Sequence, residues 1–459
     1  MKKNKYLHLL LVMAVLTAVF FIFTATTVYG ATQKNSAGET SWYHSWMSQQ
    51  TATGNWSGLR TDLQDKGVTV SSNFTTDISG NPSGGLKQSY KYAGLLDLAL
   101  ALDFEKIASV KGLALTVSNF LASGSNLSAA IGEPFGVQEI YCPGSYWLGE
   151  IDLSQSLFDD TVTLEAGRLF AGDVFATSKF WQYYLTGGLN DNFEALTDNI
   201  FFPHFQVTSW GARISYEPNK NWNLVAAMYN ADPAVNYTDN YGAYLNFRTK
   251  FGYLAIAQLT YKHHQSREED GLPGSACFGG YYESSKFTDI VNPNKVWRGG
   301  NYGLYLVFDQ MLYKGDWPDF TGPSHMSSQA TYAEKSKNPY HRQTAVSHDR
   351  PKGLSLWGGA YIAPQVHINP QTFQLTTGLV YQGLPPNRDR DVTAFAIVMG
   401  KFSRKLTGQR METVLELNHR FQAGPWFYIT PDIQYVINPN GQKSISDALV
   451  LGLEVSANF

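Results

Sequence analysis

The stretch DALVLGLEVSANF, residues 447–459, alternates between apolar and polar residues with a period of two. An extended chain places successive side chains on opposite faces. The apolar face carries Leu449, Leu451, Leu453, Val455, Ala457 and Phe459, and the other face carries Gly452, Glu454, Ser456 and Asn458. A strand of this kind, bonded on both sides in a closed sheet, is typical of an outer-membrane β-barrel, where one face meets lipid and the other lines a lumen.

The same alternation recurs along the chain. We expect strands within 67–79, 95–105, 113–121, 147–154, 161–167, 210–217, 222–229, 244–247, 253–261, 303–311, 353–362, 373–381, 393–399, 413–418, 427–437 and 447–459. The total is about 16, an even number as in single-chain bacterial barrels. The sequence therefore predicts an all-β fold, a transmembrane barrel of about 16 antiparallel strands with a short N-terminal helix.

The connections between these runs mostly alternate in length, as the short periplasmic turns and long external loops of such barrels do. Short links are expected at 158–160, 218–221 and 422–424, and long ones at 122–145, 169–206 and 264–300. The stretch from 314 to 352 is long where the count predicts a short turn. It is either an insertion or the sign of a miscounted strand.

The N-terminus has the features of a secretory signal peptide. Three lysines precede an uncharged run from Leu9 to Phe23, and small residues then suit cleavage before Ala31. The alternative is a membrane anchor, but the run is shorter than the roughly 20 residues that a spanning helix needs. We expect a signal peptide at 1–30, a leader with a short amphipathic helix at 31–67, and a barrel at 68–459.

Composition agrees with a large barrel. Removal of residues 1–30 leaves 32 basic residues (35 − 3) against 38 acidic ones, a charge of −6, and no nucleic-acid partner is expected. Mean hydropathy is −0.24 because apolar and polar strand faces average out. The roughly 430 remaining residues exceed one ordinary soluble core. Cys142 and Cys277 form either one disulfide between loops or two free thiols.

Several motifs in order resemble the OprB family of carbohydrate-selective porins. They are GNWSGLRTDLQDKGV, SGNPSGGLKQ, LLDLALALDFEKI, GRLFAGDVF, GLVYQGLPPNRDRD and ITPDIQYVINPNG, followed by the terminal strand. The resemblance implies a sixteen-stranded barrel in the outer membrane of a Gram-negative-type bacterium, through which sugars diffuse into the periplasm. It also implies that the Phe-ended strand closes the sheet against the first strand and is read by the barrel-assembly machinery. Ser125 stands where some members carry an arginine, and the 314–352 stretch is a second departure.

The loop at 169–206 is the best candidate for a constriction, because a sugar-passing pore needs a narrow zone with hydrogen-bonding groups and aromatic faces. Arg168 and Asp173 stand at its entrance in a pattern shared with the family, and Trp181 follows. Alternation directs further polar residues to the lumen: Glu150, Glu165, Arg213, Asp432 and Gln434. Opposite charges across a lumen orient dipolar solutes. The alternatives are a loop anchor for Arg168 and simple hydration for the other charges.

Aromatic residues that share a face with Leu and Ile are expected to face lipid at the membrane interfaces. They are Trp147, Trp210, Trp222 and Tyr435.

Three other functions remain as alternatives. An enzymatic barrel is disfavoured, since the chain contains neither GxSxG nor HExxH, and no cofactor or metal is expected. A secreted sugar-binding β-protein would dissolve without detergent. A general diffusion porin for small polar solutes is the nearest alternative to a selective one. The expected partners are permeating sugars and the lipid bilayer, and an oligomer is possible.

Overall fold

The computed structural model describes residues 42–267, 269–316 and 351–459. The chain divides into an N-terminal unit that ends at Trp46 and a barrel unit from Met47 to Phe459. The N-terminal unit contributes most of helix α2 (Trp42–Met47). The predicted signal peptide at 1–30 and most of the 314–352 stretch lie outside the described residues.

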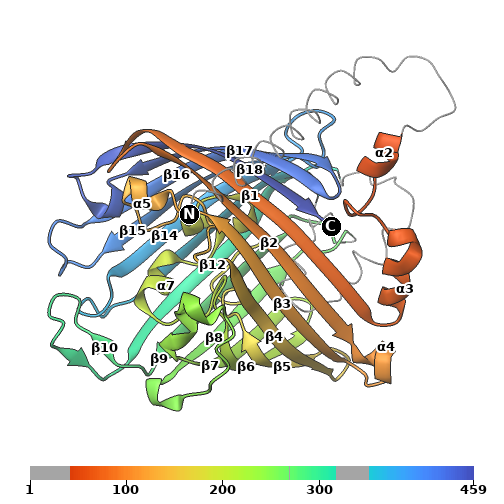
Figure 1. Ribbon diagram of the computed structural model, residues 1–459, viewed down its shortest axis with the longest axis horizontal. Coiled ribbons are helices and arrows are strands. Elements are labelled where there is room, and N and C mark those ends of the chain that lie inside the picture. The colour runs from red at the N-terminus through yellow and green to blue at the C-terminus, as the bar shows by residue number, and fades with distance from the viewer. Residues whose placement is uncertain (1–41, 268, 317–350) are drawn as a thin grey trace. The chain divides into compact units, whose positions relative to one another are not determined.

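Sixteen antiparallel strands form one closed barrel (Figure 1), which confirms the predicted fold class. The strands are β1 (Val68–Gly85), β2 (Ser89–Asp103), β3 (Leu113–Gly124), β4 (Tyr146–Leu157), β5 (Val162–Leu169), β6 (Ser209–Asn219), β7 (Trp222–Asn230), β8 (Tyr253–His263), β9 (Gly274–Glu283), β12 (Asn301–Lys314), β13 (Gly353–Ile362), β14 (Gln371–Gln382), β15 (Val392–Phe402), β16 (Met411–Gly424), β17 (Phe427–Ile437) and β18 (Ser446–Asn458). Each strand pairs with its neighbours in this order, so every ladder is local except the closing one.

The remaining elements are short. A separate two-stranded sheet joins β10 (Phe287–Thr288) and β11 (Val296–Trp297). The helices are η1 (Trp56–Gly58), α3 (Leu59–Asp65), α4 (Phe104–Ala108), α5 (Ser128–Ile131), η2 (Trp181–Tyr183), α6 (Gly187–Asn190), α7 (Glu194–Asn199), η3 (Pro233–Asn236), η4 (Thr238–Asn240), η5 (Thr249–Phe251) and η7 (Pro439–Gly441). Helix α3 lies within the segment for which a short amphipathic helix was predicted. None of the described helices has the length and apolar character needed to cross a bilayer.

The C-terminal strand β18 closes the barrel, because it pairs with β17 on one side and with β1 on the other. Its apolar and polar faces separate as predicted. Leu451, on the outer face, is 49% exposed, whereas Glu454 and Ser456, on the inner face, are 4% and 2% exposed. The alternation therefore sends the apolar side chains outward and the polar ones toward the interior, as a barrel in lipid requires.

The two ends of the barrel differ in the length of their connections. Short turns at 158–161, 220–221 and 425–426 share one end, which we call the short-turn end. The long connections 125–145, 170–208 and 231–252 share the opposite end. The segment between β12 and β13 belongs to the short-turn end, and these two strands pair directly with each other. The order of the barrel strands is therefore not in error at that point.

The sequence analysis makes two errors in the strands: it predicts one strand that does not exist and misses one that does. The total of 16 is therefore unchanged. Residues 244–247 form no strand but belong to the connection between β7 and β8. Strand β9 was missed, because glycines interrupt its alternation. Gly279 is required there by packing: a Cβ atom would lie 2.2 Å from the ring of Tyr305 on the neighbouring strand β12.

The prediction that Trp147 faces lipid is also wrong. Ser118 on β3 stands opposite both Gly149 and Glu150 on β4, so β4 contains a β-bulge at this point. A bulge inserts one extra residue and reverses the facing of the residues beyond it. Trp147 consequently points inward, where it is 1% exposed and packs in a cluster with Phe120. By contrast, Trp222 and Tyr435 are 42% and 43% exposed, as expected for outward-facing residues.

The interior of the barrel is partly filled by two connections. We call residues 170–208, between β5 and β6, the inward loop, and residues 125–145 the β3–β4 loop. Apolar residues of both, including Phe135, Phe175 and Phe193, form one buried cluster with inward side chains of the wall such as Trp357 and Val414. The two loops thereby narrow the lumen. The polar space that remains between the loops and the wall is the candidate functional site.

Candidate functional site in the barrel interior

Wall side chains hold the backbone of the inward loop from many sides of the barrel. Carboxylates of the wall accept hydrogen bonds from loop N–H groups: Glu150 from Phe170 (3.2 Å), Glu283 from Phe201 (2.7 Å), and Glu416 from Leu185 and Thr186 (2.7 and 3.0 Å). Amides act in the same way: Gln258 and Gln374 accept from Ala176 and Ala195, and Asn418 donates to the Tyr183 carbonyl. Because the loop interior would otherwise bury unpaired backbone groups, these bonds fix its path.

Trp181 anchors the loop through apolar contact. Its ring meets those of Phe193 and Trp357 edge-on, with centroids 5.4 and 6.0 Å apart. Trp181 is 2% exposed, so it belongs to the packed cluster between the loop and the wall. It lines neither of the two cavities described below.

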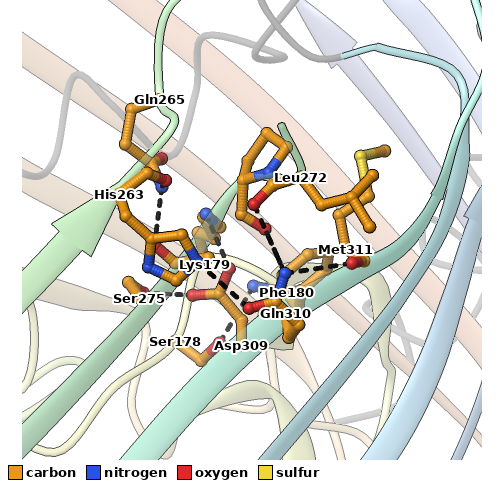
Figure 2. A network of polar contacts seen from close by, with 12 residues as sticks. Ser178, Lys179, Phe180, His263, Gln265, Leu272, Ser275, Asp309, Gln310 and Met311 are labelled. Carbon is orange, nitrogen blue, oxygen red and sulfur yellow. Dashed lines mark hydrogen bonds and ion pairs between the residues drawn. The ribbon is translucent and has the colours of Figure 1, made fainter. Parts of the chain in front are cut away.

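The tip of the inward loop is tied to β12 by an ion pair. Figure 2 shows Lys179 reaching Asp309, with 2.8 Å between Nζ and Oδ1. Ser275 on β9 donates a hydrogen bond to the other oxygen of Asp309. Close by, His263 and Gln310 hydrogen-bond each other at 3.1 Å (Figure 2). The tip is thus fixed from β9 and β12 as well as through the loop's apolar core.

Two cavities lie on either side of this tip. The wide cavity, about 540 Å³, extends along β5–β9 and β12 and includes residues near the short-turn end, such as Lys220 and Gln265. The narrow cavity, about 180 Å³, lies against β1, β2 and β16–β18 and is bounded by both loops. Asp173 and Thr177 line both cavities. The loop tip therefore divides the interior into two polar compartments.

In the wide cavity the dominant feature is the Glu165–Arg213 pair. Arg213 Nε and Nη2 donate to the two Glu165 oxygens at 2.6 and 2.7 Å, a bidentate arrangement. Arg213 also donates to the Phe170 carbonyl, where the inward loop begins (3.2 Å). Alternation directs both residues inward, as predicted, and the structure brings them together.

In the narrow cavity the dominant feature is Arg420. Its guanidinium carbon lies 4.0 Å from the ring centre of Tyr428 and 5.1 Å from that of Tyr183. Its Nη2 donates to the Gln182 carbonyl at 2.7 Å and lies 3.5 Å from Glu454. Arg420 therefore joins the wall to the inward loop at the narrow cavity.

Asp173 lies where the two cavities meet, and its Oδ2 has no hydrogen-bond partner among the described residues. Burial raises the pKa of Asp173 to about 7; Arg213 opposes this rise, and the acidic groups Asp191 and Glu165 add to it. Asp173 thus places a carboxyl group at the junction of the two cavities.

Arg168 has a different setting. It shares its face of β5 with Leu164 and lines neither cavity. Its guanidinium donates to the Tyr244 carbonyl (2.6 Å) and to the carbonyl and hydroxyl oxygens of Thr208 (2.7 and 3.0 Å). Arg168 thus links the connection between β7 and β8 to the end of the inward loop. This geometry fits the loop anchor that the sequence left as the alternative.

The other predicted site residues are placed as follows. Glu150 faces inward but binds the first residue of the inward loop. Gln434 donates to the carbonyl of Val137 in the β3–β4 loop (3.0 Å) and to Asp432 (2.9 Å). Glu150, Asp432 and Gln434 are buried and line neither cavity.

Sequence reasoning missed Arg420, Tyr428 and the acidic residues of the loops that line the narrow cavity, Glu139 and Asp191. The alternation of the predicted strand 413–418 continues to Arg420 and places it on the inner face, but the predicted strand ended at residue 418. Nothing in the local sequence indicates how the loops fold back into the barrel.

Neither Cys142 nor Cys277 forms a disulfide, and both side chains are buried. Within the described residues, no group of three or more His, Cys, Asp or Glu side chains is arranged to hold a metal ion.

A closed sixteen-stranded barrel with an apolar outer face and a polar interior, narrowed by a loop folded inside, defines an outer-membrane porin. Residues 87–459 match the family described as "Carbohydrate-selective porin, OprB family", and the chain belongs to it. It is thus a porin of the Gram-negative outer membrane that passes carbohydrates, a channel and not an enzyme.

Individual relatives agree with this assignment. Porin B of Pseudomonas aeruginosa is 23% identical, and the match covers 88% of this chain and 90% of that protein. The structure of OprB from Pseudomonas putida at high pH superposes with a TM-score of 0.75 at 21% identity, covering 90% of this chain and 99% of the other. The same protein at low pH gives 0.56 at 20% identity, with the same coverage. At these identities the structural likeness shows the fold.

Proposed function

We propose that sugars cross this porin through the narrow cavity between the inward loop and the wall formed by β1, β2 and β16–β18. The observation that carries the proposal is Arg420, which lines this cavity and spans from the wall to the loop carbonyl of Gln182. The wide cavity then acts as the vestibule toward the short-turn end, which faces the periplasm in barrels of this kind.

The lining of the narrow cavity suits a polyhydroxylated solute. Gln182, Asn190 and Asp173 offer hydrogen-bonding groups from the loop, and Ser456 offers a hydroxyl from β18. Phe205 adds aromatic surface, on which the C–H face of a sugar ring can stack. A site of this size that replaces water at a few hydroxyl groups binds weakly, and weak binding keeps the flux high.

The predicted site residues divide between two roles in this account. Asp173 meets the solute at the junction of the cavities, and Glu165 and Arg213 face it in the vestibule. Arg168, Glu150, Asp432, Gln434 and Trp181 act as positioning residues, because their contacts hold the loops that shape the passage.

We also propose the organisation and biogenesis that the sequence predicts: a cleaved segment at 1–30, a leader at 31–67 and a barrel at 68–459. The apolar outward face of β18, with Phe459 after it, is the feature for the barrel-assembly machinery to read. Phe459→Ser should lower the amount of protein recovered in the outer membrane.

Cross-linking of the protein in native membranes will determine whether it works as one copy or as an oligomer.

The route is tested by filling it. Ser456 is 2% exposed and lines the narrow cavity, whereas the next residue, Ala457, lies on the outward face of β18. Ser456→Trp should reduce the initial rate of glucose-driven swelling of proteoliposomes several-fold, and Ala457→Trp should leave it unchanged. A Ser456→Trp barrel that admits glucose at the wild-type rate would place the route elsewhere.

A further inference from the structure

The charged residues of the narrow cavity are strongly unbalanced. Five acidic side chains line it: Asp97, Glu139, Asp173, Asp191 and Glu454. Arg420 is the one basic residue among the lining residues. The acidic residues come from β2, the β3–β4 loop, the inward loop and β18, so they surround the space from several directions.

Arg420 does not present a free positive charge to this space. Its guanidinium is paired with Glu454 and bonded to the Gln182 carbonyl, and it lies against the ring of Tyr428. Asp191 has a basic partner outside the cavity lining, since His204 Nδ1 lies 2.5 Å from its Oδ2. Asp173 carries an oxygen without a hydrogen-bond partner among the described residues. The cavity therefore keeps an excess of negative charge beyond its internal pairs.

The wide cavity provides an internal comparison. Its lining has four acidic residues, Glu165, Asp173, Glu217 and Asp309, and four basic ones, Lys179, Arg213, Lys220 and Lys262. Two of the basic residues are paired directly with acidic ones, Arg213 with Glu165 and Lys179 with Asp309. The excess of acidic groups is thus a property of the narrow cavity and is absent from the wide one.

We propose that the narrow cavity selects permeants by charge, admitting neutral and cationic sugars and excluding anionic ones such as sugar acids and sugar phosphates. This inference rests on the proposed route through that cavity. A narrow aqueous space with one sign of charge and low-dielectric walls concentrates the opposite sign and repels its own. A neutral sugar is little affected by this field, a protonated amino sugar is attracted by it, and a carboxylate or phosphate on the sugar meets repulsion from every side.

The direct test is the reversal potential of the purified protein in a planar bilayer under a tenfold KCl gradient at pH 9, where Glu139, whose pKa burial raises to about 8, is ionised. We expect K⁺ to pass about tenfold more readily than Cl⁻, the lower end of the enrichment that such a field produces. A double variant, Glu139→Gln with Glu454→Gln, should reduce that ratio toward one. Asp159→Asn with Asp160→Asn is the matched control, because it also removes two acidic charges, but from exposed positions on a short turn.

Uptake of labelled sugars into proteoliposomes supplies the second readout. Glucosamine should enter at least as fast as glucose, and glucuronate about tenfold more slowly. The double variant should raise the glucuronate rate relative to the glucose rate. A wild-type channel that prefers Cl⁻, that shows no preference, or whose preference is unchanged by the double variant would overturn the charge selection. Failure of glucose itself to enter would instead reject the proposed route.

Discussion

Glu165 and Arg213 face each other across β5 and β6 and form two hydrogen bonds of 2.6 and 2.7 Å, with both side chains buried inside the barrel. Removal of one member of a buried pair leaves an uncompensated charge, which typically costs about 3–5 kcal/mol. We therefore expect Glu165→Gln to lower the free energy of unfolding by about 3 kcal/mol. Urea titration in lipid vesicles, followed by tryptophan fluorescence, measures this change.

The matched control is the exposed pair of Lys111 and Asp159, whose side chains are 80% and 95% exposed. Exposed pairs contribute little to stability, so Asp159→Asn should leave the unfolding midpoint unchanged. The double variant Glu165→Gln with Arg213→Gln removes both charges and should recover most of the lost stability. Equal loss in the single and double variants would mean that the ion pair is not the source of the effect.

Glu416 holds the inward loop through two N–H groups, those of Leu185 and Thr186. Glu416→Ala removes both acceptors, so this part of the loop should move away from the wall. We expect a larger and noisier single-channel conductance. Glu217→Gln also removes an inward carboxylate, but Glu217 accepts its hydrogen bond from Asn223 on the neighbouring strand and not from the loop, so the conductance should stay near that of the wild type. If Glu416→Ala shows the conductance and current noise of the wild type, other contacts alone fix the loop.

Arg168 donates to acceptors on two separate segments, at Tyr244 and Thr208. Arg168→Lys keeps the positive charge but not the planar set of donors. If Arg168 is an anchor, Lys cannot replace it. Arg168→Lys should then lower the free energy of unfolding by about 2 kcal/mol and speed proteolysis within residues 231–252. As a residue that contacts the permeant by its charge, it should tolerate Lys with normal selectivity. Limited proteolysis and conductance measured on the same preparation separate these two roles.

The charge of the narrow cavity should depend on pH. Burial raises the pKa of Glu139 to about 8, and the charges of Asp191 and Glu454 add to the rise. Burial likewise raises the pKa of Asp173 to about 7. Because carboxyl groups with raised pKa values ionise only as the pH approaches those values, negative charge accumulates between pH 6 and pH 9. His204 contributes in the same direction. Burial lowers its pKa, but the neighbouring Asp191 raises the pKa by more, so the pKa lies above its ordinary value. His204 therefore also loses its positive charge as the pH rises.

We therefore expect the preference for K⁺ over Cl⁻ to increase from pH 6 to pH 9, as measured by reversal potentials in buffers of equal ionic strength. Glu139→Gln should flatten the upper part of this dependence. A preference that is constant across the range, or that decreases with rising pH, would contradict the assignment of these groups to the passage.

The barrel was predictable from the sequence because its strands are specified locally. Each strand face meets either lipid or the lumen, so a period of two is visible wherever the strand is regular, as in β18. The errors occur where a local feature breaks that period. Glycines hide β9, and the bulge opposite Ser118 turns Trp147 inward. The short run at 244–247 alternates too briefly to distinguish a strand from a loop.

The site was less predictable for a physical reason. The partners of the inward loop come from residues separated by as many as about 230 positions, as in the bonds of Glu416 to Leu185 and Thr186. Alternation shows that Glu150 and Gln434 point inward, but it does not show whether water or a loop backbone meets them. That outcome depends on how the loops fold inside the barrel, and the loops have no periodicity to reveal it.

The most direct test of the central claim is the uptake of sugars by proteoliposomes that contain the wild-type protein, compared with size-matched polar solutes that are not sugars. A selective passage lined by hydrogen-bonding groups predicts that small neutral sugars enter faster than their size-matched counterparts, and that their rate saturates with concentration. Rates that depend on size alone would identify a general diffusion channel. A barrel sealed to every small sugar would contradict the account altogether.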